Sequence, residues 1–288
     1  MPGRAGPAGR RRPCSQDGTT GAARRAGLLL VAYRKHRPDA PPGFFACEAA
    51  GLRWLDVPGG PRVVRVLAVA DDALDLEELH PAAPTPTAAR AFGAALARLH
   101  DAGAPAFGAP PDGWAGDGFF GPLDDPLPLR AGAYDRWGAF YADLRVEQVR
   151  AELEARGRLC PALARDLECL SAALRAGAWD DDEPPARLHG DLWSGNVVWT
   201  ADGTVLIDPA AHGGHRLTDL AMLELFGAPH LSEIRAGYAA VHPLPAPGAW
   251  DDLVALHQVY PLGMHAVLFG GGYVGAFARL VARLAAAA

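Results

Sequence analysis

The residues best suited to chemistry lie in one segment in the second half of the chain. His189 and Asp191 are followed by Asn196, five residues after Asp191, and by an isolated carboxylate, Asp208, twelve residues further on. This His-x-Asp-x4-Asn spacing with a later aspartate is typical of a catalytic loop for phosphoryl transfer and its metal-binding residues. Each residue alone is equally typical of a turn, but the joint spacing predicts phosphoryl transfer.

A predicted hairpin brings two of these residues together. Apolar runs of strand type flank Ala201-Asp202-Gly203, and a three-residue loop with Gly203 in the left-handed conformation would join them. This register places Asn196 directly opposite Asp208, with Cβ atoms about 5 Å apart, so both side chains could bind one Mg²⁺ ion. Asp191, on the preceding loop, is then free to orient a substrate hydroxyl and accept its proton.

Lys35 is the only lysine in a chain that contains 27 lysine and arginine residues. It follows a short apolar run of strand type, and Glu48 lies on the next predicted helix. This order favours a Lys–Glu ion pair that holds the α- and β-phosphates of ATP. An ammonium group is a compact point charge, unlike the planar guanidinium that this chain uses elsewhere. The alternative is a solvated surface lysine.

The elements around these residues predict an α+β fold with two lobes. Residues 28–79 combine strands with one helix at 45–55 into a small β-rich lobe, whose last strand ends at Glu77-Glu78-Leu79. We expect backbone groups of this connector to contact the adenine, although its side chains are also typical of a polar strand end. Residues 80–288 are mainly helical by periodicity and form a larger lobe with the catalytic loop and the substrate site. Residues 1–27 hold six arginines, one acidic residue and no apolar periodicity, which predicts a divergent basic tail without folded structure.

The composition restricts the classes of partner. A net charge of -6 and a pI near 5.9 leave no basic surplus for neutralising phosphates, which argues against nucleic acid as the main partner. No apolar run approaches the roughly 20 residues that a membrane-spanning helix needs. The four cysteines form no CxxC pair and are typical of reduced thiols, so we expect a cytoplasmic protein with no membrane partner.

Several longer stretches carry a family resemblance. They are HGDLWSGN at 189–196, IDPA at 207–210, GHR at 214–216, DLAM at 219–222, LFG at 225–227 and YPLGMH at 260–265. They resemble the fructosamine kinase (ketosamine-3-kinase) family, relatives of the aminoglycoside phosphotransferases with the protein-kinase-like fold. The resemblance implies a kinase that uses ATP and Mg²⁺ to phosphorylate O3 of a ketosamine, either a small molecule or an adduct on a protein lysine. The unstable 3-phosphate would then release the adduct and restore the amine, which is a deglycation or protein-repair activity.

The resemblance also implies a role for each matching residue. Asp191 would be the base, Asn196 and Asp208 the metal ligands, Lys35 and Glu48 the phosphate-holding pair, and His189 and Asp219 the structural support of the catalytic loop, while Trp193, His215, Arg216 and His265 would line the sugar side.

The chain departs from the family pattern in two places. Leu217 follows the GHR motif where the family usually has an acidic residue, and no convincing Gly-rich phosphate loop precedes Lys35; Asp17-Gly-Thr-Thr-Gly21 is only a faint match. Two alternatives therefore stay open: a kinase of the same fold that acts on an aminoglycoside or amino alcohol, and a pseudokinase impaired by the divergent N-terminus. The preferred ketosamine, such as a ribulosamine or a fructosamine, is open as well.

Overall fold

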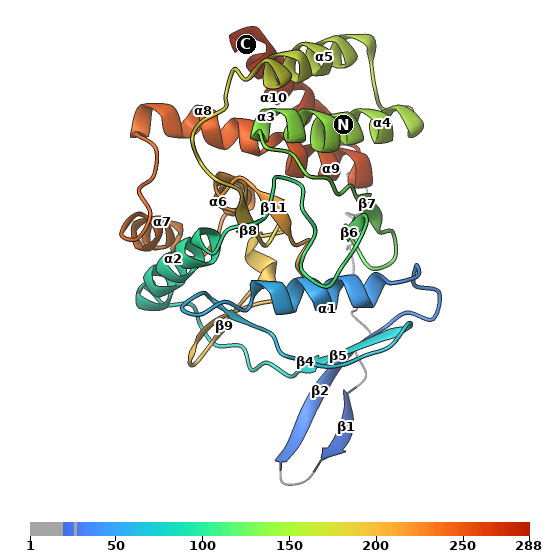
Figure 1. The fold of residues 1–288 in the computed structure, drawn as a ribbon, viewed down its shortest axis with the longest axis vertical. Coiled ribbons are helices and arrows are strands. Elements are labelled where there is room, and N and C mark those ends of the chain that lie inside the picture. Colours follow the sequence, from blue (N-terminus) through green and yellow to red (C-terminus); the bar gives the residue numbers. More distant parts are fainter. Residues whose placement is uncertain (1–19, 26–27) are drawn as a thin grey trace, which may run out of the picture.

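The computed structural model describes residues 20–25 and 28–288, with side chains described from Ala32 onward. In Figure 1 a small lobe that contains the blue strands lies below a larger lobe made mostly of helices. In the part of the chain that the structure describes, no helix is both long and apolar enough to cross a membrane. The predicted α+β architecture with two lobes is therefore confirmed.

The small lobe is a four-stranded antiparallel sheet with one helix. Its strands are β1 (Thr20–Arg25), β2 (Leu28–His36), β4 (Val66–Val69) and β5 (Ala73–Glu77), in the spatial order β1-β2-β5-β4. The helix, α1 (Phe44–Leu55), buries Phe45, Ala49 and Leu52. Because these residues recur at i, i+4 and i+7, they form one apolar face along the helix.

The sheet begins earlier than the sequence predicts. The composition of residues 1–27 predicts no strand before Leu28, yet β1 pairs with β2 from Thr20 opposite Tyr33 to Arg25 opposite Leu28. Strand pairing is made by backbone groups, so it does not require an apolar pattern in the paired segment. The rest of the predicted tail, residues 1–19 and 26–27, lies outside the described residues.

A short strand connects the small lobe to the catalytic hairpin of the large one. β3 (Arg62–Val63) pairs in parallel with β10 (Gly203–Leu206), which pairs antiparallel with β9 (Val197–Thr200). The chain then crosses into α2 (Pro86–Asp101), whose first turn is capped by the Thr85 side chain. Backbone hydrogen bonds therefore join the two lobes close to the predicted site.

The larger lobe contains the remaining elements. They are β6 (Gly118–Phe120), β7 (Leu127–Leu129), α3 (Trp137–Phe140), the π-helix η1 (Tyr141–Val146), α4 (Glu147–Ala155), α5 (Pro161–Ala176), β8 (Ala186–Leu188), the 3-10 helix η2 (Ser194–Asn196), β11 (His212–Gly214), α6 (Leu217–Phe226), α7 (Leu231–Ala239), α8 (Pro247–His257), α9 (Val259–Phe269) and α10 (Gly272–Ala287). The sequence predicts one helix where α8 and α9 lie, but Pro261 has no N–H to donate to the His257 carbonyl. That carbonyl accepts a hydrogen bond from the Tyr141 hydroxyl instead, at 3.2 Å.

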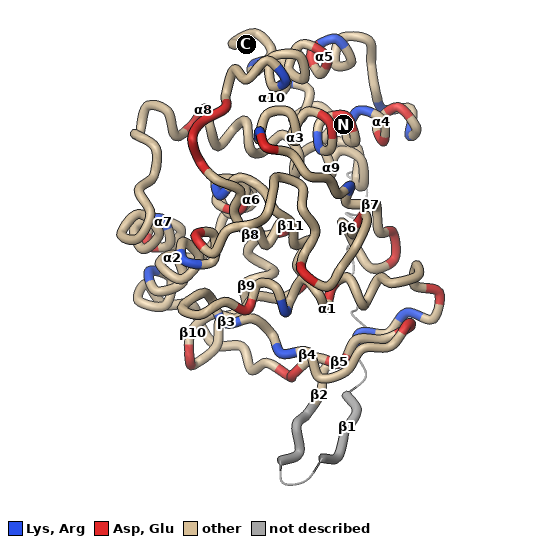
Figure 2. The backbone as a smooth tube through the Cα atoms, viewed as in Figure 1, with Lys and Arg blue, Asp and Glu red and all other residues tan. Residues whose placement is uncertain are grey.

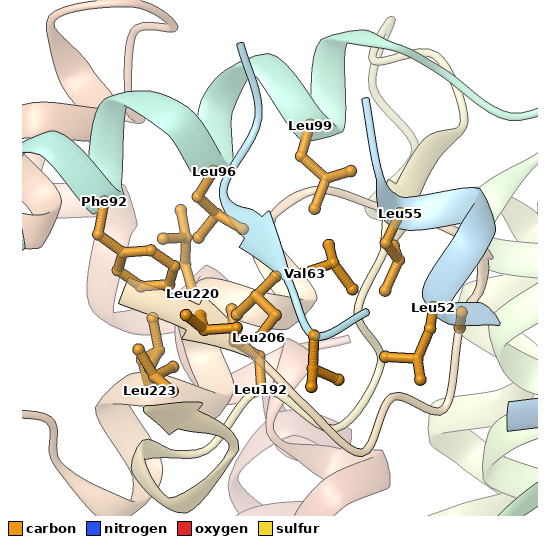
Figure 3. Packing of buried hydrophobic residues seen from close by; sticks show 14 of the residues in the cluster. Leu52, Leu55, Val63, Phe92, Leu96, Leu99, Leu192, Leu206, Leu220 and Leu223 are labelled. Carbon is orange, nitrogen blue, oxygen red and sulfur yellow. The ribbon is translucent and has the colours of Figure 1, made fainter. Parts of the chain in front are cut away.

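Two hydrophobic clusters form the core. In the first, leucines of α1, α2 and α6 surround Val63 of β3 and Leu206 of β10 (Figure 3). Leu192, next to the predicted base, is fully buried in the same cluster. The second cluster fills the space between η1, α5, α9 and α10. Since the first cluster extends from α1 to α6, it fixes both sides of the predicted site to one core.

Candidate active site

The hairpin β9–β10 carries Asn196 and Asp208 just beyond its two open ends. Gly203 pairs with Thr200, so the turn has two residues, and Gly203, with a φ of 125°, is the first residue of β10. Asn196 therefore lies opposite Ile207, whose N–H donates to the Asn196 carbonyl at 3.1 Å. The predicted direct pairing of Asn196 with Asp208 is wrong by one residue.

Asp208 nevertheless lies at the same site as Asn196. Its φ of 53° is a left-handed conformation that few residues other than glycine adopt. The Nδ2 atom of Asn196 is 3.4 Å from the Asp208 carbonyl oxygen, 2.8 Å from the Asp191 carbonyl oxygen and 3.1 Å from Asp191 Oδ2. The amide of Asn196 therefore contacts both aspartates at once.

The surroundings of the Asp191 carboxyl group shift its pKa toward neutral pH. Burial raises its pKa to about 7, although the hydrogen bond from Asn196 lowers it and the charges of Asp208 and Asp219 add to the rise. A proton acceptor works best when its pKa lies near the operating pH. A pKa near neutral is compatible with the proton-accepting role that the sequence predicts for Asp191.

Asp219, in the first turn of α6, holds the backbone of the catalytic loop. Its Oδ2 accepts a hydrogen bond from the His189 N–H (2.8 Å) and its Oδ1 one from the Gly190 N–H (2.9 Å). Gly190 has a φ of 80°, and a Cβ at this position would lie 2.1 Å from the Ala210 carbonyl oxygen. Glycine is therefore required where the loop turns toward Asp191.

His189 supports the same loop from inside. Its Nε2 donates to the Ile207 carbonyl (2.8 Å), and its Nδ1 accepts a hydrogen bond from the Asp191 N–H (3.3 Å). Burial lowers its pKa, so the ring is neutral with one donor and one acceptor. His189 thus ties the loop before Asp191 to the strand end before Asp208.

Lys35 joins the small lobe to this cluster. Its Nζ lies 2.7 Å from Glu48 Oε1 and 2.6 Å from Asp208 Oδ1. Burial lowers the pKa of Lys35, but the charges of Glu48 and Asp208 outweigh burial and raise it above its ordinary value. The predicted ion pair with Glu48 is present, and Lys35 also reaches the carboxylate predicted to bind metal.

The side chains at the centre of the cluster suit Mg²⁺. Asp208 and Asn196 offer oxygen ligands, and Mg²⁺ is usually held by one or two carboxylates together with substrate phosphates. Among the described residues, no group of three His, Cys, Asp or Glu side chains could hold a metal ion by itself. The oxygen donors of Asp208 and Asn196 therefore fit an ion that arrives with a nucleotide.

The connector between the lobes uses its side chain and backbone differently. Glu77 Oε2 lies 2.7 Å from Arg62 Nη2, and its Oε1 accepts a hydrogen bond from the Arg65 N–H at 3.0 Å. The backbone N–H groups of Glu78 and Leu79 have no hydrogen-bond acceptor in the part of the chain that is described. The Glu77 carboxylate is thus paired with Arg62 and with the Arg65 N–H group. The backbone N–H groups of the connector remain available to a ligand.

Of the four residues predicted to line the sugar side, Trp193 is exposed and His265 is half-buried. Trp193 is 42% exposed two residues after Asp191, and its ring lies so close to Gly195 that a Cβ there would be 2.1 Å away. His265 is half-buried on α9, where its ring lies 4.6 Å from that of Phe226. The ring of Trp193 is therefore an exposed aromatic group two residues after Asp191.

His215 and Arg216 are buried instead, and they hold an acidic segment in place. His215 Nε2 lies 3.1 Å from Asp181 Oδ2, and Arg216 Nη2 lies 2.6 Å from Glu183 Oε1. Figure 2 shows this acidic segment as a red stretch of the connection between α5 and β8. Each residue thus has one ion pair with this connection, and their assignment to the sugar side stays a prediction. Leu217 is also buried, which explains an apolar residue after the GHR motif.

Sequence reasoning misses a buried pair behind Asp219. His100 Nε2 lies 3.2 Å from Asp219 Oδ2, and His100 Nδ1 lies 2.8 Å from the Tyr238 hydroxyl. His100 lies in the last turn of α2 and Tyr238 on α7. No spacing in the sequence relates them, because their contact depends on how the two helices pack.

Comparisons with known proteins agree with this geometry. The family model for fructosamine kinase matches residues 33–287. A Thermus thermophilus protein assigned as a ketoamine kinase is 36% identical over 258 residues, which cover 89% of this chain and 87% of the relative. A Lactiplantibacillus plantarum protein with the same assignment is 34% identical over 255 residues, with 86% and 85% covered.

Solved structures give the same result. A Thermobifida fusca structure assigned as a fructosamine-3-kinase is 40% identical and matches with a TM-score of 0.80 over 95% of both chains. The aminoglycoside phosphotransferase APH(2'')-Ib matches with a TM-score of 0.58 over 95% of this chain and 92% of its own. Its identity is only 12%, so that likeness shows the fold alone. The chain belongs to the fructosamine kinase family and is therefore a phosphotransferase that acts on a hydroxyl group.

Proposed function

We propose that this protein transfers the γ-phosphate of ATP to the O3 hydroxyl of a ketosamine in a Mg²⁺-dependent reaction. The observation that carries the proposal is the meeting of Lys35, Asp208 and Asp191: Lys35 Nζ lies 2.6 Å from Asp208 Oδ1, and the Asn196 amide contacts both aspartates. These are the groups that phosphoryl transfer requires for phosphate binding, metal binding and proton acceptance. Family membership supports a ketosamine as the acceptor.

The residues of the site would divide the work as follows. Asp191 would orient the acceptor hydroxyl and take up its proton while the new oxygen–phosphorus bond forms and the bond from the γ-phosphorus to ADP breaks. Lys35 would contact the α- and β-phosphates and keep Glu48 as its partner, which frees Asp208. When bound by Asp208 and Asn196, Mg²⁺ would neutralise part of the phosphate charge.

The surroundings of Asp191 suit a sugar that carries an amine. The exposed ring of Trp193 offers an apolar face for the C–H side of a sugar, and a protonated amine is attracted to such a ring. The backbone of Glu78 and Leu79 would face the adenine. The 3-phosphate formed on the ketosamine would be unstable, so the phosphorylated sugar would detach and the free amine would be restored. This is the deglycation that the family resemblance implies.

The test is a measurement of ATP consumption against a panel of acceptors. The panel contains ribulosamines, erythrulosamines and fructosamines, both free and on peptide lysines, with aminoglycosides and amino alcohols as controls. We expect Mg²⁺-dependent turnover with at least one ketosamine and a phosphate on O3, identified by phosphorus–proton NMR. Turnover with the controls alone would replace the substrate class, and nucleotide binding without any turnover would identify a pseudokinase.

The role of Asp191 is tested in the same assay with two matched variants. Asp191→Asn keeps the shape of the side chain but cannot accept the proton, so kcat should fall roughly 10³-fold while ATP binding survives. Asp202→Asn makes the same change at an exposed residue of the hairpin turn and should leave kcat unchanged. Near-normal turnover in Asp191→Asn would remove the base from this proposal.

A further inference from the structure

Behind the catalytic loop lies a buried arginine whose charge is not neutralised by a carboxylate. Arg145 is 1% exposed and belongs to the π-helix η1, a rare form of helix that is frequent at functional sites. Its guanidinium carbon lies 4.8 Å from the centre of the Phe140 ring and 5.2 Å from that of Tyr260. Aromatic rings stabilise the cation but do not remove its net charge.

The hydrogen bonds of Arg145 leave part of its guanidinium without a partner. Nη1 donates to the carbonyl oxygens of Arg130 (2.9 Å) and Leu144 (3.2 Å). Nε and Nη2 are buried and have no acceptor in the described part of the chain, and the same holds for the Tyr260 hydroxyl. The carboxylate of Asp117 attracts the guanidinium only from a distance, since it is exposed and accepts a hydrogen bond from the Ala131 N–H.

The residues that carry these unpartnered groups line one small cavity. The cavity has a volume of about 10 Å³, and Arg145, Tyr260, His212 and Gly190 are among the residues that line it. This volume has room for about one water-sized particle. The wall that Gly190 forms is the backbone of the catalytic loop directly before Asp191.

The unpaired charge of Arg145 beside the cavity favours an anion over a water molecule. The guanidinium groups Nε and Nη2 can only donate, and the Tyr260 hydroxyl is available as a further donor. His212 donates from Nδ1 to the Ala210 carbonyl at 2.8 Å, and burial, with the nearby charge of Arg145, lowers its pKa to about 3, so it adds no positive charge. A buried charge is strongly unfavourable unless it is paired. A monoatomic anion would accept hydrogen bonds from several donors and supply the missing charge, whereas a water molecule would leave the charge of the guanidinium unpaired.

We propose that this cavity binds one chloride ion, held by Nε and Nη2 of Arg145 and by the Tyr260 hydroxyl. The ion neutralises the buried guanidinium and fills the space beneath Gly190. It is separate from the nucleotide site, because the groups that hold it lie on η1 and α9 and not on the β9–β10 hairpin.

Crystallography with bromide tests the site directly. Bromide replaces chloride at such sites and scatters anomalously, so crystals of the full chain soaked in sodium bromide should show one anomalous peak between Arg145 and Tyr260. A peak at this position supports the proposal. A well-ordered water in the cavity without an anomalous signal would overturn it.

Thermal unfolding gives an independent test in solution. We expect the Tm of the wild-type protein to be about 3 °C higher in sodium chloride than in sodium gluconate of equal ionic strength, because gluconate is too large for the cavity. Arg145→Met should abolish this difference, and Tyr260→Phe should reduce it by removing one donor. If Arg145→Met does not fold, Tyr260→Phe still decides the matter.

Arg187→Met is the matched control for these variants. Arg187 also lies over an aromatic ring, that of Trp54 at 4.9 Å, and donates to the carbonyl oxygens of Trp54 and Gly103, but it does not line the cavity. This variant should keep the full chloride effect. An equal chloride effect in the wild type, Arg145→Met and Tyr260→Phe, or none in the wild type, would show that the cavity is not a chloride site.

Discussion

Two buried cations of this protein are surrounded by opposite charge patterns. Lys35 lies within 2.7 Å of Glu48 and 2.6 Å of Asp208, and although burial lowers its pKa, the two carboxylates raise it above its ordinary value. Arg145 has no carboxylate within hydrogen-bonding distance among the described residues, and burial lowers its pKa. Lys35 thus has two carboxylates for one positive charge, whereas Arg145 has no paired carboxylate among the described residues.

This difference indicates the sign of the ligand that each region is built for. Around Lys35 two carboxylates face one ammonium group, and Asp191 adds a third acid beyond Asn196. Such a surplus of negative charge suits a metal ion that arrives with a nucleotide. Around Arg145 two guanidinium nitrogens have no acceptor and no carboxylate lies within hydrogen-bonding distance among the described residues, which suits an anion. Buried charges are stable only when paired, so the unbalanced charge in each cluster points to what completes it.

Asp208→Ala breaks the first pattern most completely. It leaves Lys35 with Glu48 alone and removes the proposed charged metal ligand, so we expect kcat to fall by about 10³-fold. Mg²⁺-dependent ATP binding, measured by calorimetry with and without Mg²⁺, should be lost. Asn196→Ala removes a neutral ligand and should weaken this binding less. If Asp208→Ala binds Mg²⁺ and ATP as tightly as the wild type, Asp208 is not a metal ligand.

Lys35→Arg keeps the charge of the first cluster but changes its shape. A planar guanidinium should fit poorly between Glu48, Asp208 and the phosphates, and a misplacement of about 1 Å costs roughly 10²-fold in rate. The expected loss is in kcat/KM for ATP, measured at saturating acceptor. Arg34→Lys is the matched control, because Arg34 is half exposed on the same strand and pairs with Asp75; it should have no effect. Unchanged kinetics in Lys35→Arg would make Lys35 a bystander.

The sequence predicts well that the candidate catalytic residues lie together, because they are linked by short spacings. His189, Asp191 and Asn196 lie within eight positions, and one loop followed by one hairpin brings them together. The sequence also predicts a helix at 161–176, and α5 occupies this range, because clear periodicity marks a helix well. The ion pair of Lys35 and Glu48 follows from one strand and the next helix.

The remainder depends on backbone choices and contacts that no spacing encodes. Gly203 is acceptable at the end of a three-residue loop or at the start of a strand, and this choice shifts the hairpin by one residue. The partners of His215 and Arg216 are Asp181 and Glu183, more than 30 residues earlier in the chain. Arg145 is one of 27 basic residues, and only its burial distinguishes it from the others.

Asp219→Asn tests a third way of stabilising a buried charge, through backbone N–H groups. The amide keeps one oxygen that can accept a hydrogen bond, but its NH₂ group would face the other backbone N–H donor of the loop. The free energy of unfolding should therefore fall by about 2 kcal/mol, which corresponds to a Tm lower by roughly 5 °C. Asp251→Asn, at an exposed position of α8, should leave the Tm unchanged. A stable Asp219→Asn variant would show that the two hydrogen bonds to the loop contribute little.

The charge of Asp219 also gives this effect a defined pH dependence. Burial raises the pKa of Asp219, but the hydrogen bond and charge of His100 outweigh burial, and the pKa lies below its ordinary value. A carboxyl group with a lowered pKa stabilises the fold above its unfolded pKa of about 3.9, and this contribution is lost as the pH falls through the folded pKa. The difference in Tm between the wild type and Asp219→Asn should therefore persist at pH 5 and shrink below pH 4.

The smallest expected effect comes from His212, the neutral ring beside Arg145. Burial, with the charge of Arg145 as the next cause, lowers its pKa to about 3. In the unfolded chain the ring binds a proton below about pH 6.5, where the folded protein does not. The neutral ring therefore does not lower the free energy of unfolding above pH 6.5, and the fold loses stability as the pH falls below that value.

Urea unfolding of His212→Asn at pH 6.5 and 5.5 measures this contribution. The asparagine amide can still donate to the Ala210 carbonyl, but it does not titrate, so the wild type should lose about 1 kcal/mol more unfolding free energy over this interval than the variant. The matched control is His230→Asn, which changes an exposed histidine whose backbone has a φ of 54°, a conformation that asparagine tolerates. Parallel losses in the wild type and His212→Asn would mean that the ring is protonated in the folded protein. The cluster around Arg145 would then stabilise a second positive charge, that of the protonated His212 ring. It would no longer differ in its charge pattern from the cluster around Lys35.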